Sequence, residues 1–480
     1  MRKADRGRSG PTAMLKRQLG SVVSTSKIER FRTSFDGSKL SFLPDAVVNV
    51  RETSDIAATL ALANEFRVPV TVRGGGTSLT GSASPRRNGW VLDLSRLNRI
   101  RIDAESGMAF VEAGAVVAKI QAAAKRKGWF YPPDPASKDY CTIGGTVACN
   151  AGGMHGLSYG VTRDYVLALE GYLPTGERVR WGRPLFKYSA GFNLRDLWIG
   201  SEGMLGVVTN IVVRLVPLPP ARLMIVAAFS SDTDAFRAAR KLLAARLSPS
   251  VCEFIGRNCM RCLDRAAHNM LVFSHYRPLL LVELSGERPD VNARALLLRL
   301  WASSNAITWE EAGTDSRAEE FWAARRGVSG SLSVFGKGKL NQDIVLPRAN
   351  YAAFGRYLEC LEAESGLPLP VFGHLGDGNL HVNVMYDPDK PQSCRMAEKT
   401  VGQLMKKVVS LGGAISGEHG IGLTKSQFLR LEHSEPEIAA MRAVKRALDP
   451  KGILNPGKMF EPFDLSKHRR VVASMPWDGA

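Results

Sequence analysis

Hydrophobic and polar residues alternate with two different periods along this chain. Short apolar runs indicate strands, and longer segments with apolar residues every third or fourth position indicate helices. A βαβ unit is predicted from residues 44–50, the helical pattern of Asp55 to Phe66 and the apolar run Val68 to Val72. Further predicted elements are strands near Gly89 to Leu94 and Met108 to Glu112, a helix from Val116 to Lys127 and a strand-rich run to Val179.

The pattern changes after Leu215 to Pro220, a proline-rich segment that we expect to be a domain boundary. Beyond it, the predicted elements are strands at Leu223–Phe229, Val251–Ile255 and Leu279–Leu284 and helices at Thr233–Leu247 and Asp290–Ser303. Strands with helices between them predict an α+β domain, in which helices cover one face of an antiparallel sheet.

Length and composition predict a globular protein of more than one domain. The 480 residues exceed one typical core, so two or three domains are expected. Hydrophobic residues make up 45% and charged residues 23%, which is typical of soluble proteins. No apolar run approaches the length of a membrane span, so an integral membrane protein is not expected. The net charge of +18 is spread along the chain, which does not favour nucleic acid as a partner.

Residues 1–35 are predicted to be a basic, poorly ordered N-terminal extension. The basic residues are Arg2, Lys3, Arg6, Arg8, Lys16, Arg17, Lys27, Arg30 and Arg32, against Asp5 and Glu29. A solvated tail is the preferred interpretation, with a transit-like leader or a patch for anionic lipid as alternatives. The extension has no apolar core of the kind found in secretory signals, so secretion is not predicted.

The cysteines indicate reduced thiols. There are seven, an odd number without regular spacing, which favours a cytosolic compartment. Cys259 and Cys262 form a single Cys-x-x-Cys pair. Because no second pair accompanies them, we interpret both as packing residues.

The segment from Pro132 to Gly153 begins with a conformationally restricted backbone and ends with glycines and small side chains. Prolines restrict the backbone at 132, 133 and 135, whereas glycines at 144, 145, 152 and 153 leave it permissive. Most other side chains near these glycines are small. Such a segment suits a large flat ligand that lies against main-chain N–H groups, and an ordinary Gly/Pro loop is the alternative.

A second glycine-rich loop, Arg73 to Gly81, follows a predicted strand. It does not match the Rossmann pattern, because Leu79 occupies the place of the third glycine. It does not match the P-loop either, because Ser82 and Ala83 replace Lys and Ser/Thr. Its main-chain N–H groups and its hydroxyls are nevertheless suited to a pyrophosphate.

Chemically active side chains gather in two glycine-rich turns of the second half. In Gly373 to Val384, a Gly-Asp-Gly turn lets His374 and His381 converge, and Asn383 shares a strand face with His381. In the second turn, Glu418 and His419 lie between glycines. Two histidines and one carboxylate suit a divalent transition metal, and purely structural histidines are the alternative.

The helix predicted from Glu319 to Ser329 places Trp322, Arg325 and Ser329 on one face. An arginine held there could bind a carboxylate through two parallel hydrogen bonds. The alternative is a solvated arginine beside Arg326.

Four segments resemble the p-cresol methylhydroxylase-type FAD-binding domain in order and spacing. They are Arg73 to Gly81, Pro132 to Gly153, Tyr159 to Val166 and Asp196 to Thr209. The resemblance implies that the first segment holds the FAD pyrophosphate and the second lines the isoalloxazine and ribityl chain. The implied cofactor-binding residues are Arg73, Gly74, Gly75, Gly76, Thr77, Ser78, Gly81, Pro133, Asp134, Thr142, Gly144, Gly145, Ala148, Asn150, Gly152, Gly153, Tyr159, Gly160, Glu202, Gly206, Val207 and Asn455. Some relatives attach FAD through a histidine where this chain has Thr77, so the resemblance implies non-covalent FAD; Cys141 and Cys149 are the only nearby thiols.

The second half resembles the C-terminal domain of FAD-linked oxidases acting on D-2-hydroxy acids. The resemblance implies His374, His381 and Glu418 as ligands of a divalent metal (Zn, Mn or Fe), His419 as the base, and Arg325, Ser329, Asn383 and His419 as substrate-binding residues. Asp449 to Lys458 resembles the family's C-terminal return to the flavin, with Asn455 near the ring. Members specific for 2-hydroxyglutarate carry a lysine where this chain has Asn341, two residues before Asp343. This departure favours a smaller or different acid.

Together these features predict a dehydrogenase or oxidase that converts a D-2-hydroxy acid, such as D-lactate or glycolate, to the 2-keto acid. The predicted organisation is 1–35 as the extension, 40–217 as the FAD-binding domain, 220–460 as the substrate- and metal-binding domain and 461–480 as a tail. The alternatives are a D-2-hydroxyglutarate dehydrogenase, an FAD-binding electron-transfer subunit and an alkylglycerone-phosphate synthase-like transferase. The electron acceptor is left open between an iron–sulfur subunit, a quinone and a cytochrome. A cytoplasmic location is expected, with a homodimer and peripheral association with the inner membrane left open.

Overall fold

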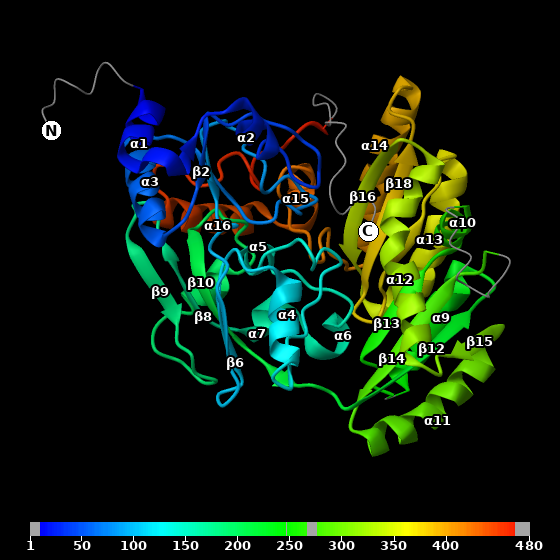
Figure 1. Ribbon diagram of the computed structural model, residues 1–480. Coiled ribbons are helices and arrows are strands. Elements are labelled where there is room, and N and C mark those ends of the chain that lie inside the picture. Colours follow the sequence, from blue (N-terminus) through cyan, green and yellow to red (C-terminus); the bar gives the residue numbers. More distant parts are fainter. Residues whose placement is uncertain (1–9, 246, 266–275, 466–480) are drawn as a thin grey trace, which may run out of the picture. The chain divides into compact units, whose positions relative to one another are not determined.

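The computed structural model describes residues 10–245, 247–265 and 276–465 (Figure 1). In this part of the chain, one compact unit holds residues 10–151, 161–218 and 418–465, and a second holds residues 152–160 and 219–417 apart from the gaps just given. The division after Leu218 falls within the boundary predicted at Leu215 to Pro220.

The first sheet of the first unit contains the predicted βαβ unit. Its elements are β1 (Val23–Ser24), β2 (Ala46–Asn49), α3 (Thr53–Phe66), β3 (Val70–Arg73) and β4 (Trp90–Asp93). The strand order is β1-β2-β4-β3, and β4 is parallel to both β2 and β3. Helix α3 begins where the carboxylate of Asp55 accepts the backbone N–H groups of Arg51 and Glu52, and it ends at Arg67, whose φ of 55° is left-handed.

Residues 10–35 are ordered, which corrects the prediction of a poorly ordered extension; residues 1–9 lie outside the described part. The segment forms α1 (Pro11–Leu19), η2 (Gly20–Val22) and α2 (Lys27–Arg32) besides β1. Leu15 is fully buried, and the indole N–H of Trp90 donates to the hydroxyl of Thr12 at 3.0 Å. Apolar residues interspersed among the basic ones therefore hold this segment in the core.

The second sheet of the first unit is entirely antiparallel. It comprises β5 (Ile100–Asp103), β6 (Met108–Glu112), β10 (Val207–Arg214), β8 (Val166–Tyr172) and β9 (Arg178–Gly182), in that order. A short pair, β7 (Trp129–Phe130) with β11 (Val216–Pro217), stands apart from it. The helices of this region are α4 (Val117–Lys125), α5 (Ile143–Cys149), α7 (Thr162–Tyr165) and α8 (Leu194–Trp198).

The C-terminal segment belongs to the first unit as well. It contains η5 (Ser426–Phe428), α15 (Leu429–Glu432) and α16 (Glu435–Leu448). After α16 the chain runs alongside β3, where Val70 N–H donates to the carbonyl of Ile453 at 2.8 Å and Asn455 N–H donates to the carbonyl of Val70 at 2.7 Å. These backbone bonds attach the end of the chain to the sheet that precedes the glycine-rich loop.

The second unit is built on one seven-stranded antiparallel sheet (Figure 1). Its strands in spatial order are β15 (Thr308–Glu311), β12 (Ala221–Ala228), β14 (Leu279–Gly286), β13 (Val251–Ile255), β17 (Val371–His374), β18 (Asn379–Tyr386) and β16 (Gly338–Val345). Its helices are α6 (Gly156–Tyr159), α9 (Asp232–Ala244), α10 (Arg257–Arg265), α11 (Arg288–Asn305), α12 (Asp315–Ser331), η3 (Leu332–Phe335), η4 (Arg348–Asn350), α13 (Tyr351–Ser365) and α14 (Pro391–Ser410). Within the described ranges, no helix is both long enough and apolar enough to cross a membrane.

Helices cover both faces of this sheet, which corrects the prediction that they cover only one. Ile255 packs in a core with Phe321 of α12 and with Cys259 and Cys262 of α10. Its neighbour Phe254, which points to the opposite face, contacts Phe236 of α9 at a ring-centroid distance of 4.7 Å. Burial on both sides explains why every residue of β13 is buried. The interpretation of the two cysteines as packing residues is confirmed.

Candidate active site

A hairpin at one end of the second unit's sheet brings His374 and His381 together. His374 is the last residue of β17, and His381 is the third residue of β18. The turn requires Gly378, whose φ is 91° and whose added Cβ would lie 2.3 Å from the carbonyl oxygen of Leu346. The two rings are perpendicular, at a centroid distance of 5.5 Å, and one nitrogen of each lies within 4.8 Å of the other. The predicted convergence of these histidines is confirmed.

Glu253, on the neighbouring strand β13, stands behind His374. Its side chain is fully buried, and its Oε1 is 2.6 Å from Nδ1 of His374. Burial by itself would raise the pKa of this carboxyl group, but His374 and Arg325 outweigh burial and hold the pKa below its usual value. The ionised carboxylate can only accept, so Nδ1 carries the proton and Nε2 presents its lone pair.

Arg325 of α12 is buried, as the predicted helical face requires, with only 5% of its surface exposed. Its Nε donates to Oε2 of Glu253 at 2.7 Å, and its Nη2 forms an ion pair with the same oxygen at 2.7 Å. Its guanidinium lies 4.8 Å from the ring centre of Phe372. Arg326 instead pairs with Glu319 at the surface. The alternative of a solvated arginine at position 325 is therefore wrong. One edge of the guanidinium is already occupied, and Nη1 forms no hydrogen bond within the described residues.

A second buried carboxylate, that of Asp343 on β16, organises the turn that leads to Glu418. Asp343 pairs with His381 in the strand register. Its Oδ1 accepts the amide of Asn379 at 2.6 Å, and its Oδ2 accepts the backbone N–H of Gly417 at 3.0 Å. Gly417 is thereby held at the hairpin end of the sheet, and Glu418 and His419 follow it directly in the chain.

His419 belongs to the first unit, together with Glu418. Its Nε2 lies 3.7 Å from Oε1 of Glu418, and its carbonyl oxygen accepts the hydroxyl of Thr80 at 3.2 Å. The side chains of His419 and Glu418 are 19% and 11% exposed. The backbone at His419 is therefore tied to the glycine-rich loop that contains Thr80.

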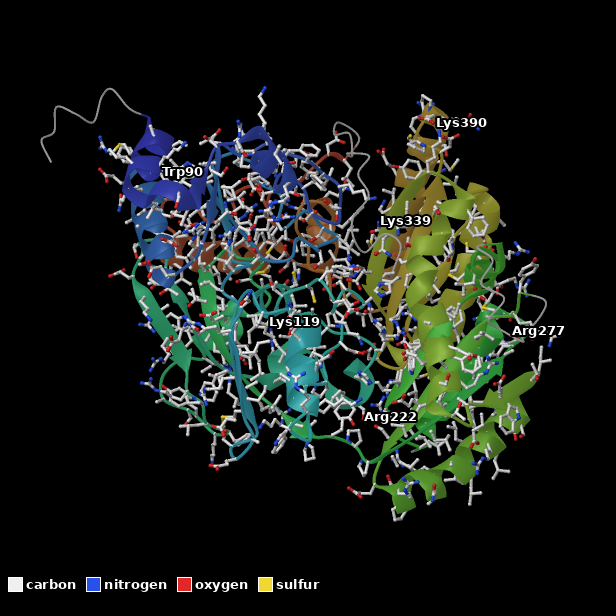
Figure 2. All side chains as sticks on the ribbon, in the orientation of Figure 1. Trp90, Lys119, Arg222, Arg277, Lys339 and Lys390 are labelled. Atoms are coloured by element: carbon white, nitrogen blue, oxygen red, sulfur yellow. The ribbon has the colours of Figure 1, made fainter. Side chains whose placement is uncertain are left out.

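Asn383 is fully buried and already well bonded. Its Nδ2 donates to the carbonyls of Pro370 and His381, and its Oδ1 accepts Nδ2 of Asn341 at 2.9 Å. The Oδ1 of Asn341 is buried without a partner among the described residues. Two positions earlier on β16, Nζ of Lys339 (labelled in Figure 2) lies 3.1 Å from the hydroxyl of Ser329 on α12. The contact of Asn383 with substrate stays a prediction.

In the first unit, the two glycine-rich segments pack directly against each other. An added Cβ on Gly74 would lie 2.1 Å from Oγ1 of Thr142, and one on Gly75 would lie 2.3 Å from the carbonyl oxygen of Tyr140. An added Cβ on Gly76 would lie 2.1 Å from Nη2 of Arg73. Close packing against the Tyr140 backbone and against the side chains of Thr142 and Arg73 therefore favours glycine at these three positions, apart from any ligand.

Glu202 and Asn455 form hydrogen bonds that join the glycine-rich loop region to the C-terminal segment. The carboxylate of Glu202 accepts the hydroxyl of Ser82 at 2.6 Å and the backbone N–H groups of Ile421 and Gly422 at 2.7 and 2.8 Å. Burial raises the pKa of this carboxyl group. Asn455 donates to the carbonyls of Ser82 and Glu202 at 2.8 and 2.7 Å. Both residues hold the loop against the C-terminal segment, and their contact with FAD stays a prediction.

The nearby thiols are protonated. Burial raises the pKa of Cys141 to about 12 and also raises the pKa of Cys149. A protonated thiol is a poor nucleophile. Non-covalent attachment of FAD stays a prediction.

Most other predicted flavin contacts lie in the same unit. Gly144 packs on Ala113, and Gly206 packs on Trp198, where added Cβ atoms would lie 2.8 and 2.2 Å from their neighbours. Thr77, Ser78, Gly81, Pro133, Asp134, Gly145, Ala148, Asn150 and Val207 also belong to the first unit. Gly152, Gly153, Tyr159 and Gly160 belong to the second, where the hydroxyl of Tyr159 lies 3.2 Å from that of Ser285.

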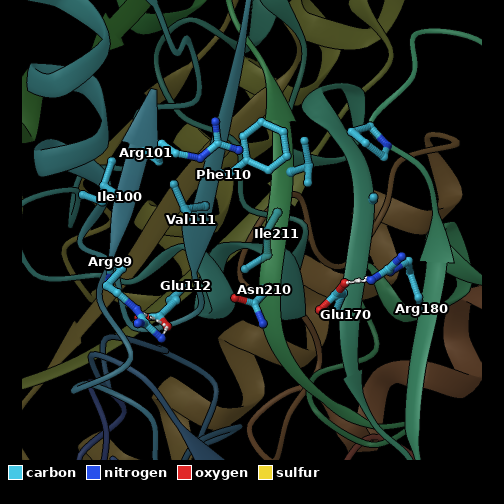
Figure 3. A pocket seen from close by; sticks show the side chains of 13 residues that line it. Arg99, Ile100, Arg101, Phe110, Val111, Glu112, Glu170, Arg180, Asn210 and Ile211 are labelled. Atoms are coloured by element: carbon cyan, nitrogen blue, oxygen red, sulfur yellow. Dashed lines mark hydrogen bonds and ion pairs between the residues drawn. The ribbon is translucent and has the colours of Figure 1, made fainter. Parts of the chain in front are cut away.

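A separate hollow of about 650 Å³ lies over the second sheet of the first unit (Figure 3). It is lined by Arg99, Ile100, Arg101, Phe110, Val111, Glu112, Ala168, Glu170, Arg180, Pro184, Asn210, Ile211 and Val212. Arg99 pairs with Glu112 and Arg180 with Glu170, whereas the guanidinium of Arg101 lies over the ring of Phe110. The hollow contains none of the predicted site residues.

Sequence comparison identifies two known domains. Residues 44–182 match the FAD-binding domain, and residues 218–459 match the C-terminal domain of FAD-linked oxidases. The chain is 35% identical over 433 residues to the glycolate oxidase subunit GlcD of Bacillus subtilis, covering 90% of this chain and 91% of that protein. It is 32% identical over 427 residues to a D-lactate dehydrogenase of Anaerostipes hadrus, covering 87% and 89% of the two chains.

The fold is that of p-cresol methylhydroxylase. The solved structure of that enzyme with substrate bound superposes with a TM-score of 0.77, at 17% identity, over 96% of this chain and 98% of the other. The predicted p-cresol methylhydroxylase-type domain followed by an oxidase C-terminal domain is thereby confirmed. With matched domains along most of its length and relatives above 30% identity, the chain belongs to the family of FAD-linked oxidases and is an FAD-dependent oxidoreductase.

Proposed function

We propose that this protein oxidises a small D-2-hydroxy acid, of the D-lactate or glycolate type, to the 2-keto acid. The observation that supports this most directly is the pair of buried imidazoles of His374 and His381 in the same unit as the buried guanidinium of Arg325. Glycolate and D-lactate in the names of the relatives support the substrate class.

The roles of the chain's residues follow from their chemistry. Arg325 would bind the substrate carboxylate through Nη1, with Ser329 and Asn383 as further substrate-binding candidates. The imidazole of His419 would accept the proton of the substrate hydroxyl. Bound non-covalently in the first unit, FAD would accept the hydrogen of the α-carbon as hydride. The substrate thus loses one proton and one hydride, which balances the conversion of an alcohol to a ketone.

His374, His381 and Glu418 would hold a divalent metal, Zn, Mn or Fe. The fit of the first two rests on the ring nitrogens within 4.8 Å of one another and on the bond of His374 Nδ1 to Glu253, which leaves Nε2 for a cation. Glu418 would supply the third ligand of such a site. Such a metal would make the substrate hydroxyl proton easier to lose.

The polar residues of β16 favour a small acid over 2-hydroxyglutarate. Asn341 replaces the lysine that the resemblance associates with a distal carboxylate, and Lys339 is bonded to Ser329 at the surface of α12. A D-2-hydroxyglutarate dehydrogenase is therefore the second candidate.

Two functions of other classes are less well supported. An FAD-binding electron-transfer subunit would not need the two histidines and Glu418. A transferase related to alkylglycerone-phosphate synthase would carry a histidine run where this chain has Gly417-Glu-His-Gly420.

Any iron–sulfur relay would lie on a partner, because the sequence has no ferredoxin-type cysteine run. An iron–sulfur subunit, a quinone and a cytochrome are the candidate acceptors. A cytoplasmic location, peripheral association with the inner membrane and a homodimer remain part of this proposal.

A panel of D- and L-2-hydroxy acids, scored by bleaching of the flavin without oxygen, tests the function. D-Lactate or glycolate should bleach it and L-lactate should not. Acid precipitation of the same protein should release the flavin to the supernatant. Bleaching by D-2-hydroxyglutarate alone would select the second candidate, and no bleaching by any acid would refute the proposal.

The metal is tested separately by elemental analysis. About one divalent ion per chain is expected, and His381→Ala should lose it, because a three-ligand site has no spare donor. Full metal and full turnover in His381→Ala would show that the ligands are misassigned.

A further inference from the structure

A buried carboxylate that the proposed chemistry does not use joins two residues that it does use. Glu253 is 0% exposed, and its two oxygens have different partners. Oε1 lies 2.6 Å from Nδ1 of His374. Oε2 accepts Nε of Arg325 at 2.7 Å and forms an ion pair with Nη2 at 2.7 Å. Burying an unpaired carboxylate would carry a large desolvation free energy. The ionised form of Glu253 therefore depends on its two partners.

We propose that Glu253 is a positioning residue that simultaneously sets the tautomer of His374 and the orientation of Arg325. The inference rests on the proposed function, in which His374 holds a metal and Arg325 binds the substrate carboxylate. One side chain would then align both, and a disturbance at Glu253 would weaken both together.

On the histidine side, the carboxylate allows only one tautomer to bind a metal. The tautomer protonated at Nδ1 donates to Oε1 and leaves Nε2 as a ligand. The opposite tautomer would place two lone pairs 2.6 Å apart. A carboxylate behind a ligating histidine also makes the imidazole a stronger donor to the metal.

On the arginine side, the same carboxylate holds one edge of the guanidinium. The guanidinium cannot rotate freely, because Nε is hydrogen-bonded to Oε2, Nη2 is ion-paired with the same oxygen, and the guanidinium carbon lies 4.8 Å from the ring centre of Phe372. Nη1 is then presented in a single direction. A pre-oriented donor loses less entropy on binding a carboxylate than a mobile one.

A glutamine at this position can satisfy only one of the two partners. If its amide nitrogen faced Arg325, donors would oppose donors. If its amide nitrogen faced His374, Nδ1 would have to accept, the proton would move to Nε2, and the metal would lose a ligand. Glu253→Gln is therefore nearly the same size as the native residue but should disrupt the alignment.

The test compares the FAD-loaded wild type with Glu253→Gln by Zn²⁺ competition against a chromophoric chelator. Zn²⁺ affinity should fall by about 10- to 100-fold, the usual effect of losing a partner behind a metal ligand. The KM for the acid should rise on the same sample, whereas FAD content should be unchanged. The matched control is Glu112→Gln, because Glu112 is also buried and also accepts an arginine, Arg99, at 2.9 Å. That variant should keep Zn²⁺ affinity and KM.

Glu253→Asp keeps the charge but is one methylene shorter, so it can reach one partner and not both. It provides the measurement if Glu253→Gln fails to fold, and it should also lose Zn²⁺ affinity or raise KM. A folded variant that binds Zn²⁺ and substrate as the wild type does, with only a lower melting temperature, would overturn the inference. If the wild type itself bound no Zn²⁺, the proposed metal site would fail and this inference with it. That outcome is distinguished by appearing in the wild type.

Discussion

Asn455 provides the sharpest test of how the C-terminal segment supports the flavin-binding unit. Its side chain is 1% exposed, and its Nδ2 donates to the carbonyls of Ser82 and Glu202 at 2.8 and 2.7 Å. Its Oδ1 accepts Nζ of Lys458 at 3.0 Å, and its φ of 45° is left-handed. Asparagine adopts this backbone conformation more readily than alanine does.

Replacing Asn455 with alanine should destabilise the protein by about 3–7 kcal/mol. Two buried carbonyl oxygens would lose their donor, at about 1–3 kcal/mol each. The left-handed backbone adds about 1 kcal/mol for alanine. Asn455→Gly removes the same hydrogen bonds without this strain, so it should be more stable than Asn455→Ala by about 1 kcal/mol.

Urea unfolding of the FAD-loaded protein measures both differences, and flavin release on heating should follow the same order. Lys451→Met is the control, because Lys451 lies in the same segment but is exposed, with a single bond to the carbonyl of Asn64. A loss below about 1 kcal/mol for both Asn455 variants, less than one orphaned carbonyl should cost, would refute the role of the side chain. Equal stability of the alanine and glycine variants would refute the strain.

Three further predictions concern single side chains. His419→Ala should lose kcat by about 100- to 10,000-fold, the usual contribution of a positioned base, while it keeps FAD and metal; near-normal anaerobic flavin reduction with both present would remove His419 from the mechanism. Arg325→Lys should mainly raise KM, because a lysine ammonium cannot reproduce the two parallel hydrogen bonds that a guanidinium donates to a carboxylate. Arg326→Lys at the surface should have no effect, and the reverse order in steady-state assays would contradict the assignment. Iodoacetamide at pH 8 should alkylate the exposed Cys360 but not Cys141, whose pKa is raised to about 12 by burial; mass spectrometry showing early modification of Cys141 would argue against its burial.

Local features of the active site could be read from the sequence because they depend on neighbours in the chain. A glycine turn between His374 and His381 already requires the two strands to fold back on each other. The 3.6-residue period of α12 already separates Arg325 from Arg326 by about 100° around the helix. The structure places the first in the core and the second at the surface, as that period requires.

Glu253 was missed because its role depends on partners more than seventy positions away. The only signal in the sequence is an acidic residue inside the apolar run Val251 to Ile255, where a buried strand is expected. Such a residue must find a buried counter-charge. Which residues supply it is decided by the pairing of β13 with β17 and by the packing of α12, and neither leaves a local pattern.

The same reason accounts for the two corrections to the fold. Periodicity predicted the strands of the second unit but not that helices lie on both faces, because an all-buried strand has no alternation to indicate a solvent side. Charge predicted a solvated tail at residues 10–35, whereas Leu15 and Trp90 hold that segment in place. The sequence alone determines local periods, turns and candidate donors, because these depend on adjacent residues. Burial and long-range hydrogen bonds decide the rest, because their free energy exists only when distant segments meet.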